Sequence, residues 1–271
     1  MSPYRAPERR SRKVGSPARA WRDGPAGRRA YDVPWSARDR RAPSDRWTPE
    51  AVVGVEVHGR TIDVVVDQLL GDHVHVCAPE DVGDVLELLP PDDVLGLDLV
   101  VLRQPTRKEQ TLRPAWGRIA WDVAFRGYRG PALMLDAVAL GQTLRWPRSM
   151  IPADVEELGR LRAAGFSVRS SRHGHDVRLD AVPVHRWLLS RTVPHEVGHW
   201  VDYRRRVLDP LPDDASKAEY DARLDRWMQR PHLEREALAD RYADAMSAPI
   251  LDALDHPRTD LHRRRPGGTP A

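Results

Sequence analysis

The stretch His195-Glu196-Val197-Gly198-His199 places two imidazoles four residues apart, with a carboxylate directly after the first. Residues four apart share one face of an α-helix, where two imidazoles can bind the same divalent metal ion. Glu196 then lies beside the position of a water molecule bound to that metal. The stretch therefore requires a helix at this point of the fold and predicts a metal site with hydrolytic chemistry.

The flanking residues extend this stretch into a helix, which we expect over 194–206. Pro194 is tolerated in a first helical turn, because the N–H groups of that turn have no acceptor within the helix. Thr192 is a candidate N-cap. Gly198 costs about 1 kcal/mol relative to alanine in a helix, and close approach of another backbone would explain it. The alternative is a buried amphipathic helix whose two histidines are only hydrogen-bonded. The apolar residues near helical spacing are Val193, Val197, Trp200 and Val201.

Two histidines are too few for a catalytic zinc ion, which takes three protein ligands and one water. The long pattern HExxHxxGxxH would supply a third histidine, but Asp202 and Arg205 stand at its glycine and last histidine positions. The third ligand must therefore come from elsewhere in the chain. Asp202 itself leaves three interpretations open: a partner of a ligand, an alternative ligand, or a solvated or capping carboxylate.

A second helix, expected over 233–246, has charged residues interleaved with small ones. Glu236 and Asp240 are four apart and face the same way. Ala239 and Ala243 leave room for a neighbouring helix to come close. This segment can therefore bring a carboxylate back toward the two histidines.

With these residues the chain resembles the gluzincin metallopeptidases, in which HExxH is followed some tens of residues later by a Glu on a separate helix. It is similar to the small bacterial minimal-zincin proteases related to phage-repressor and stress-response proteases. The matching residues are His195, Glu196, His199, Glu236, Ala239, Asp240, Tyr242 and Ala243. The resemblance implies a zincin-like α+β fold, in which a small mixed sheet is followed by a helical half carrying both metal-binding helices.

The resemblance also implies roles for individual residues. Glu236 becomes the third ligand of a Zn²⁺ ion, and Asp240 accepts a hydrogen bond from a ligand histidine. Glu234 is the competitor for the ligand role, and we favour Glu236 because only Glu236 has Ala three residues on and Asp four residues on.

The expected reaction is hydrolysis of peptide bonds in a protein or peptide substrate. Zinc lowers the pKa of a bound water, and Glu196 can take the proton of that water as general base and return it to the leaving amine. By the resemblance, a Tyr, His or Arg stabilises the oxyanion. For that role the sequence leaves four candidates open: Tyr203, Tyr220, His232 and Tyr242.

The length and composition of the chain indicate the size of its core and the compartment in which it resides. A length of 271 residues with 41% hydrophobic content is enough for one sizeable core. Cys77 is the only cysteine, which excludes an internal disulfide framework, removes thiolates from the ligands and favours a reducing compartment. The sequence lacks an apolar signal-peptide region and any run long enough to span a bilayer. We therefore expect a cytoplasmic protein without a membrane partner.

Charge divides the chain. Residues 1–50 hold 13 Arg and Lys against six Asp and Glu, which predicts a basic, disordered arm. A metallopeptidase domain is expected over 51–250, strand-rich over 51–150 and helical over 151–250, with a loose tail over 251–271. The arm leaves a second function open, that of a non-catalytic, zinc-stabilised interaction or DNA-associated protein. It supports nucleic-acid binding only weakly, because Arg outnumbers Lys 40 to 3 along the whole chain.

Alternating apolar residues predict a first hairpin of strands 52–57 and 61–70. By the gluzincin resemblance an edge strand lies along the cleft, where it can pair with substrate, and 176–182 is our candidate. Two histidine pairs are interpreted as polar surface rather than metal sites: His73 with His75, and His173 with His175. Further strands are expected at 73–77, 95–102, 118–125 and 132–140, a further hairpin at 166–184, and further helices at 81–89, 153–164 and 215–228.

Overall fold

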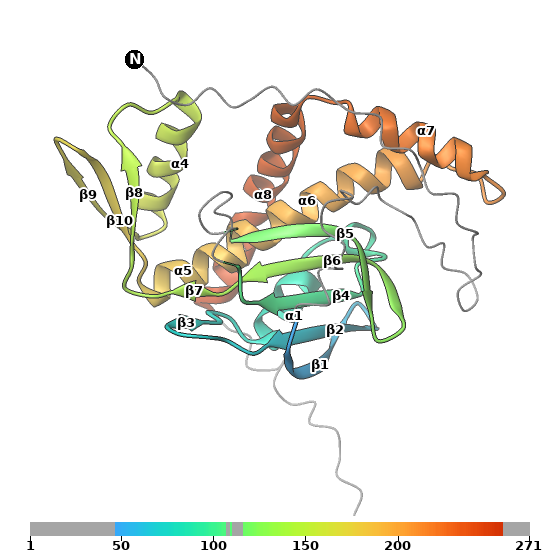
Figure 1. Cartoon of the computed structure of the whole chain (residues 1–271), viewed down its shortest axis with the longest axis horizontal. Helices are drawn as coiled ribbons and strands as arrows, with labels where there is room; N and C mark the ends of the chain where they lie inside the picture. The colour runs from blue at the N-terminus through green and yellow to red at the C-terminus, as the bar shows by residue number, and fades with distance from the viewer. Residues whose placement is uncertain (1–46, 107–108, 110–115, 257–271) are drawn as a thin grey trace, which may run out of the picture.

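The computed structural model describes residues 47–106, 109 and 116–256 (Figure 1). These residues form an α+β fold built on a mixed five-stranded sheet, which confirms the predicted α+β class and mixed sheet. The strand order is β1-β2-β4-β6-β5; β2, β4 and β6 are parallel, and each outer strand is antiparallel to its neighbour. The strands are β1 (Pro49–Val57), β2 (Arg60–Asp67), β4 (Leu99–Arg103), β5 (Gly117–Phe125) and β6 (Tyr128–Asp136).

The predicted first hairpin is confirmed, and its turn sets the register of the sheet. His58 and Gly59 connect β1 to β2 with φ values of 49° and 71°, the left-handed conformation that a two-residue type I′ turn needs. Successive residues of β2 then point to opposite faces. Val64 joins the core cluster beneath the helices, and Val65 joins a second cluster on the other face.

Short elements follow the hairpin. The strand expected over 73–77 is shorter than predicted, because β3 (His73–Val74) pairs only with the two residues of β7 (Val138–Ala139). The predicted helix over 81–89 is present as α1 (Pro79–Leu88), which packs against the β1–β2 hairpin, and α2 (Pro91–Val94) follows it. Together they contribute to the largest core cluster, on the same face of the sheet as the motif helix.

A three-stranded sheet with one helix projects from the main sheet (Figure 1). It comprises β8 (Thr143–Pro147), α4 (Pro152–Ala163), β9 (Ser167–Ser171) and β10 (Gly174–Arg178). The predicted edge strand 176–182 is wrong: β10 ends at Arg178 and is the central strand of this small sheet, and a helix begins at Ala181. The edge strand beside the motif helix is β5, whose partner in the sheet is β6.

The motif helix is part of a longer helical run. The run comprises α5 (Ala181–Trp187), the π-helical η2 (Leu188–Thr192), α6 (Val193–Tyr203) and the π-helical η3 (Arg204–Leu208). The predicted cap at Thr192 is therefore wrong, because this residue has helical backbone angles and no capping hydrogen bond. The wide turns of η2 precede Pro194, where a regular helix would require an N–H that proline lacks.

Two helices complete the described fold. Ser216 caps α7 (Lys217–Met228) and forms a capping box with Glu219, and α8 (His232–Asp255) runs beside α6. The expected arm and tail are both shortened, since residues 49–50 lie in β1 and 251–255 lie in α8; residues 1–46 and 257–271 are outside the described part. No helix in the described ranges is long and apolar enough to cross a membrane.

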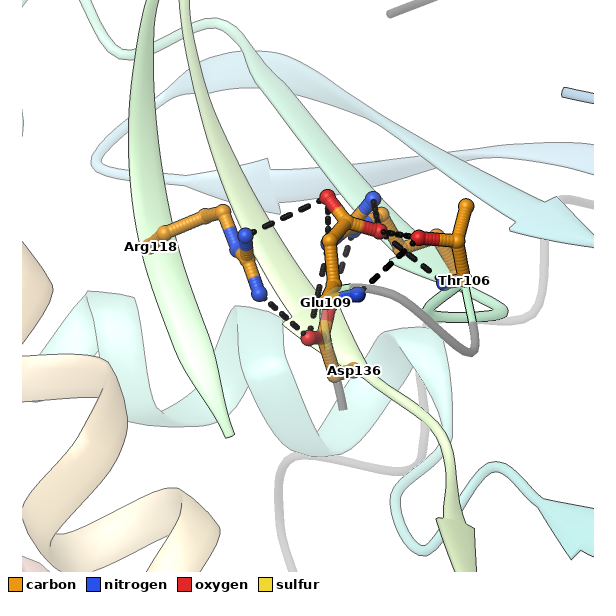
Figure 2. Close-up of polar contacts among 5 residues, drawn as sticks. Thr106, Glu109, Arg118 and Asp136 are labelled. Carbon is orange, nitrogen blue, oxygen red and sulfur yellow. Dashed lines mark hydrogen bonds and ion pairs between the residues drawn. The ribbon is translucent and has the colours of Figure 1, made fainter. Parts of the chain in front are cut away.

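A buried ion-pair network joins the ends of the three strands nearest the motif helix (Figure 2). Asp136, at the end of β6, accepts hydrogen bonds of 2.8 Å from both Arg103 and Arg118. Glu109 lies 3.2 Å from Arg103 and 3.3 Å from Arg118. Burial opposes ionisation of Glu109, but the backbone hydrogen bond from Thr106 and the charge of Arg103 outweigh it and lower its pKa to about 2. The network fixes the start of β5.

Removing Asp136 should destabilise the fold strongly. We expect Asp136→Ala to lower the free energy of unfolding by about 3 kcal/mol, because it removes the more buried of the two carboxylates that Arg103 and Arg118 share. Urea denaturation measures this. Asp122→Ala, which breaks an exposed pair with Arg129 on the same hairpin, should cost about 1 kcal/mol or less. Equal losses in the two variants would contradict a structural role for the network.

Candidate metal centre

Helices α6 and α8 bring three potential metal ligands together. His195 Nε2 lies 3.4 Å from Glu236 Oε2, and His199 Nε2 lies 3.5 Å from Glu236 Oε1. The ligand atoms of the three residues all lie within 4.8 Å of one another, and no other such group occurs within the described part of the chain. His195 and Glu236, 41 positions apart in the sequence, thus lie at one point, as the gluzincin resemblance implied.

The spacing of these atoms fits a four-coordinate metal ion. Bonds of about 2.0–2.1 Å in tetrahedral geometry place neighbouring ligand atoms about 3.3–3.4 Å apart. The distances from the two Glu236 oxygens to the histidines, 3.4 Å from Oε2 to His195 and 3.5 Å from Oε1 to His199, are close to this value. The two imidazole rings are nearly perpendicular, at 87°, so they approach the common point from different directions. Small adjustments of the side chains would therefore admit a divalent ion.

A second layer of contacts orients His195. Its Nδ1 lies 3.1 Å from Asp240 Oδ1, which leaves Nε2 directed at Glu236. Arg191, only 7% exposed, donates to Asp240 Oδ1 at 2.7 Å and also pairs with Asp244. Burial opposes ionisation of Asp240, but the bond with His195 and the charge of Arg191 lower its pKa. Arg191 was not predicted, although its position four residues before His195 places it on the same helix face.

The charges of the site depend on one another. Burial lowers the pKa of the His195 ring, but hydrogen bonds to Asp240 and Glu236 outweigh it and raise this pKa to about 9. Burial also opposes ionisation of Glu236, yet its bonds to both histidines hold its pKa below the usual range. His195 and Glu236 thus stabilise each other's charged forms.

Glu196 is enclosed between α6 and the edge strand β5. It is 8% exposed, and burial raises its pKa against the opposite pull of His195 and His199. The backbone of Ile119 in β5 hydrogen-bonds to it. A Cβ on Gly117 would lie 2.5 Å from Thr192 Cγ2 and 3.2 Å from Glu196 Cγ, so only glycine lets β5 begin this close to the helix. Because Gly117 has no side chain, the start of β5 can lie directly beside the Glu196 side chain.

Glycine also explains how closely α6 and α8 pack. A Cβ on Gly198 would lie 2.9 Å from Ala239 Cα and 3.0 Å from Tyr242 Cβ. Ala239 and Ala243 are completely buried at this contact. The predicted close approach of another backbone to Gly198 is therefore confirmed.

The structure separates the alternatives that the sequence left open. Glu234 is 59% exposed and pairs with Arg230, so it lies outside the ligand group. Asp202 is buried and accepts hydrogen bonds from the Trp227 indole and from Arg206, so it is neither a solvated carboxylate nor a metal ligand. The other histidine pairs form hydrogen bonds and no metal group within the described residues; the partners are Asp67 for His75, Arg172 for His173 and Ser170 for His175.

The four candidate oxyanion residues occupy different environments. Tyr203 and Tyr220 are buried and share a 2.8 Å hydrogen bond between their hydroxyls. Tyr242 donates to Asp93 at 3.0 Å and packs against the core. His232 alone of the four contacts the ligand group, with its Nε2 3.2 Å from Glu236 Oε1 and its side chain 72% exposed.

Comparisons with protein-family models, with curated proteins and with solved structures found no match for the chain. The geometry of the site therefore carries the functional argument by itself.

The contact at Gly198 should be sensitive to a single methyl group. We expect Gly198→Ala to lower the free energy of unfolding by about 1–3 kcal/mol, because its Cβ would press on the backbone of α8. The control is Gly159→Ala in α4, where a Cβ meets nothing within 4 Å; it should stabilise the protein by about 0.5–1 kcal/mol. Urea unfolding compares them, and stabilisation by both changes would refute the close packing of α6 on α8.

Proposed function

We propose that the protein is a zinc-dependent metallopeptidase of the gluzincin type. The observation that carries the proposal is the convergence of His195 and His199 on Glu236, with Asp240 behind His195. This is the ligand set, two histidines and one carboxylate, of known catalytic zinc sites. As part of the same proposal, the protein has a zincin-like fold and is a member of the gluzincin family.

The bound metal would supply Lewis acidity to a water molecule and to the substrate carbonyl. Glu196 acts as general base: it accepts a proton from the attacking water and returns it to the leaving amine. Its enclosed position supports this role, since burial raises its pKa and thereby makes the carboxylate a stronger proton acceptor. The bond from the Ile119 backbone holds it in place.

A peptide substrate is favoured by strand β5. Among the described residues it is the terminal strand of the sheet, and it begins against Glu196, so its outer edge starts at the candidate site. An extended peptide can add to such an edge through backbone hydrogen bonds. β5 thus takes the role that the sequence assigned to 176–182. We also propose that the protein is cytoplasmic, because Cys77 is free and buried.

Two substitutions should separate metal binding from chemistry. Purified protein should contain one zinc ion per chain by metal analysis. Glu236→Ala should lose that zinc, because it removes a ligand, whereas the neighbouring Glu234→Ala should retain it. Glu196→Gln should retain zinc and lower the rate of peptide cleavage by roughly 10²–10⁴-fold.

Each failure has a distinct meaning. Full zinc content in Glu236→Ala would refute the third ligand, and undiminished cleavage by Glu196→Gln would refute the general base. A zinc-loaded protein that cleaves no peptide would instead favour the alternative, a non-catalytic interaction or DNA-associated protein.

His232 is the proposed oxyanion-stabilising residue, because it is the one candidate that reaches the ligand group. We expect His232→Ala to lower kcat by roughly 10²-fold with little change in KM. Tyr242→Phe, which loses only the bond to Asp93, should retain kcat. Metal analysis serves as the control, since loss of zinc in His232→Ala would mean that this residue supports Glu236 instead.

A further inference from the structure

Five arginine side chains surround a cavity formed by η3, α7 and the start of the α7–α8 connection. The cavity has a volume of about 380 Å³. Its lining residues are Arg205, Arg206, Arg223, Arg226, Trp227 and Arg230. None of them belongs to the metal-ligand group. The cavity is therefore a separate feature, which the proposed peptidase chemistry does not use.

The positive charges of this cavity exceed the carboxylates that face them. Arg206 and Arg230 share Asp202, at 2.7 and 2.6 Å. The second oxygen of Asp202 also accepts the Trp227 indole at 2.8 Å, so this carboxylate is fully engaged. Its pKa is lowered by these bonds, although burial opposes that change. Arg230 also lies 3.7 Å from Glu234, so Arg206 and Arg230 together face two carboxylates.

Of the other three arginines, Arg205 alone has an ion-pair partner within the described residues. Arg205 pairs with the buried Asp93 at 2.7 Å. Arg223 and Arg226, one turn apart on α7, form no ion pair within the described part of the chain. The carboxylate that acts on Arg223 at longer range, Glu219, is fully exposed and bound to Ser216. Like charges one helical turn apart repel each other, so an anion placed between these groups would stabilise the surface.

The chemistry of the lining favours phosphate over a planar aromatic ligand. Guanidinium groups bind phosphate oxygens through paired N–H donors. The indole of Trp227 is 3% exposed and is packed against Trp121 and Tyr203, each at 5.2 Å, with Arg235 at 5.1 Å from its ring. Its face is therefore closed to stacking by a nucleobase, and recognition rests on charge.

We propose that this arginine-lined cavity binds a small anion that carries one or more phosphate groups. A volume of about 380 Å³ accommodates such a ligand but not a folded partner. Arg223 and Arg226 supply the unpaired charge, and the Asp202 network holds Arg206 and Arg230 in position. This site is independent of the metal centre and stands whether or not the protein is a peptidase.

Isothermal titration of the full chain with pyrophosphate tests the proposal. Saturable binding to one site is expected, with sodium chloride at matched ionic strength giving none. The double variant Arg223→Gln, Arg226→Gln should raise the dissociation constant at least tenfold. Since neither residue holds an ion pair, the variant should keep the stability of the parent protein, which thermal unfolding verifies.

The matched control is Arg148→Gln, Arg169→Gln, which removes the same charge from exposed positions in and next to the projecting three-stranded sheet. It should bind pyrophosphate as the parent protein does. Equal weakening in both double variants would show that overall charge is responsible, and no saturable binding would also overturn the site. Metal content is measured in parallel, so failure here is distinguishable from failure of the peptidase proposal.

Discussion

The contact between Gly198 of α6 and Ala239 of α8 sets the distance on which the candidate metal centre depends. A Cβ at residue 198 would lie 2.9 Å from the α8 backbone, so the two helices pack more closely than any other residue would allow. At that separation the Glu236 oxygens reach within 3.4 and 3.5 Å of the two imidazoles. The intrinsic cost of glycine in a helix, about 1 kcal/mol, is thus offset by the assembly of a ligand set.

A similar close approach places the sheet against the other side of α6. Gly117 begins strand β5 beside Thr192 and Glu196, and the network of Arg103, Arg118 and Asp136 fixes that strand end. The enclosure of Glu196 and the position of the terminal strand beside it therefore come from the same contact. The site lies where two glycines, one on a helix and one on a strand, permit three elements to meet.

The parts of this site that follow from local spacing could be predicted from the sequence. His195, Glu196 and His199 share one helix, the pairing of Glu236 with Asp240 follows from the same four-residue repeat, and the isolated glycine in the motif signalled a close contact. The features that were missed depend on contacts between distant segments. The edge strand was wrongly assigned to 176–182, because the place of a strand in a sheet depends on its pairing with distant strands. Thr192 was wrongly assigned as a cap, because π-helical turns leave no local signature. Arg191 escaped notice because its partners, Asp240 and Asp244, lie about fifty residues away.

X-ray diffraction at the zinc absorption edge, from crystals of the zinc-loaded full chain, tests the central claim most directly. We expect one anomalous peak bonded to His195 Nε2, His199 Nε2 and a Glu236 oxygen at about 2.0–2.2 Å, with a fourth position open toward Glu196. A peak elsewhere, no peak at these residues, or a fourth protein ligand closing the site would contradict it.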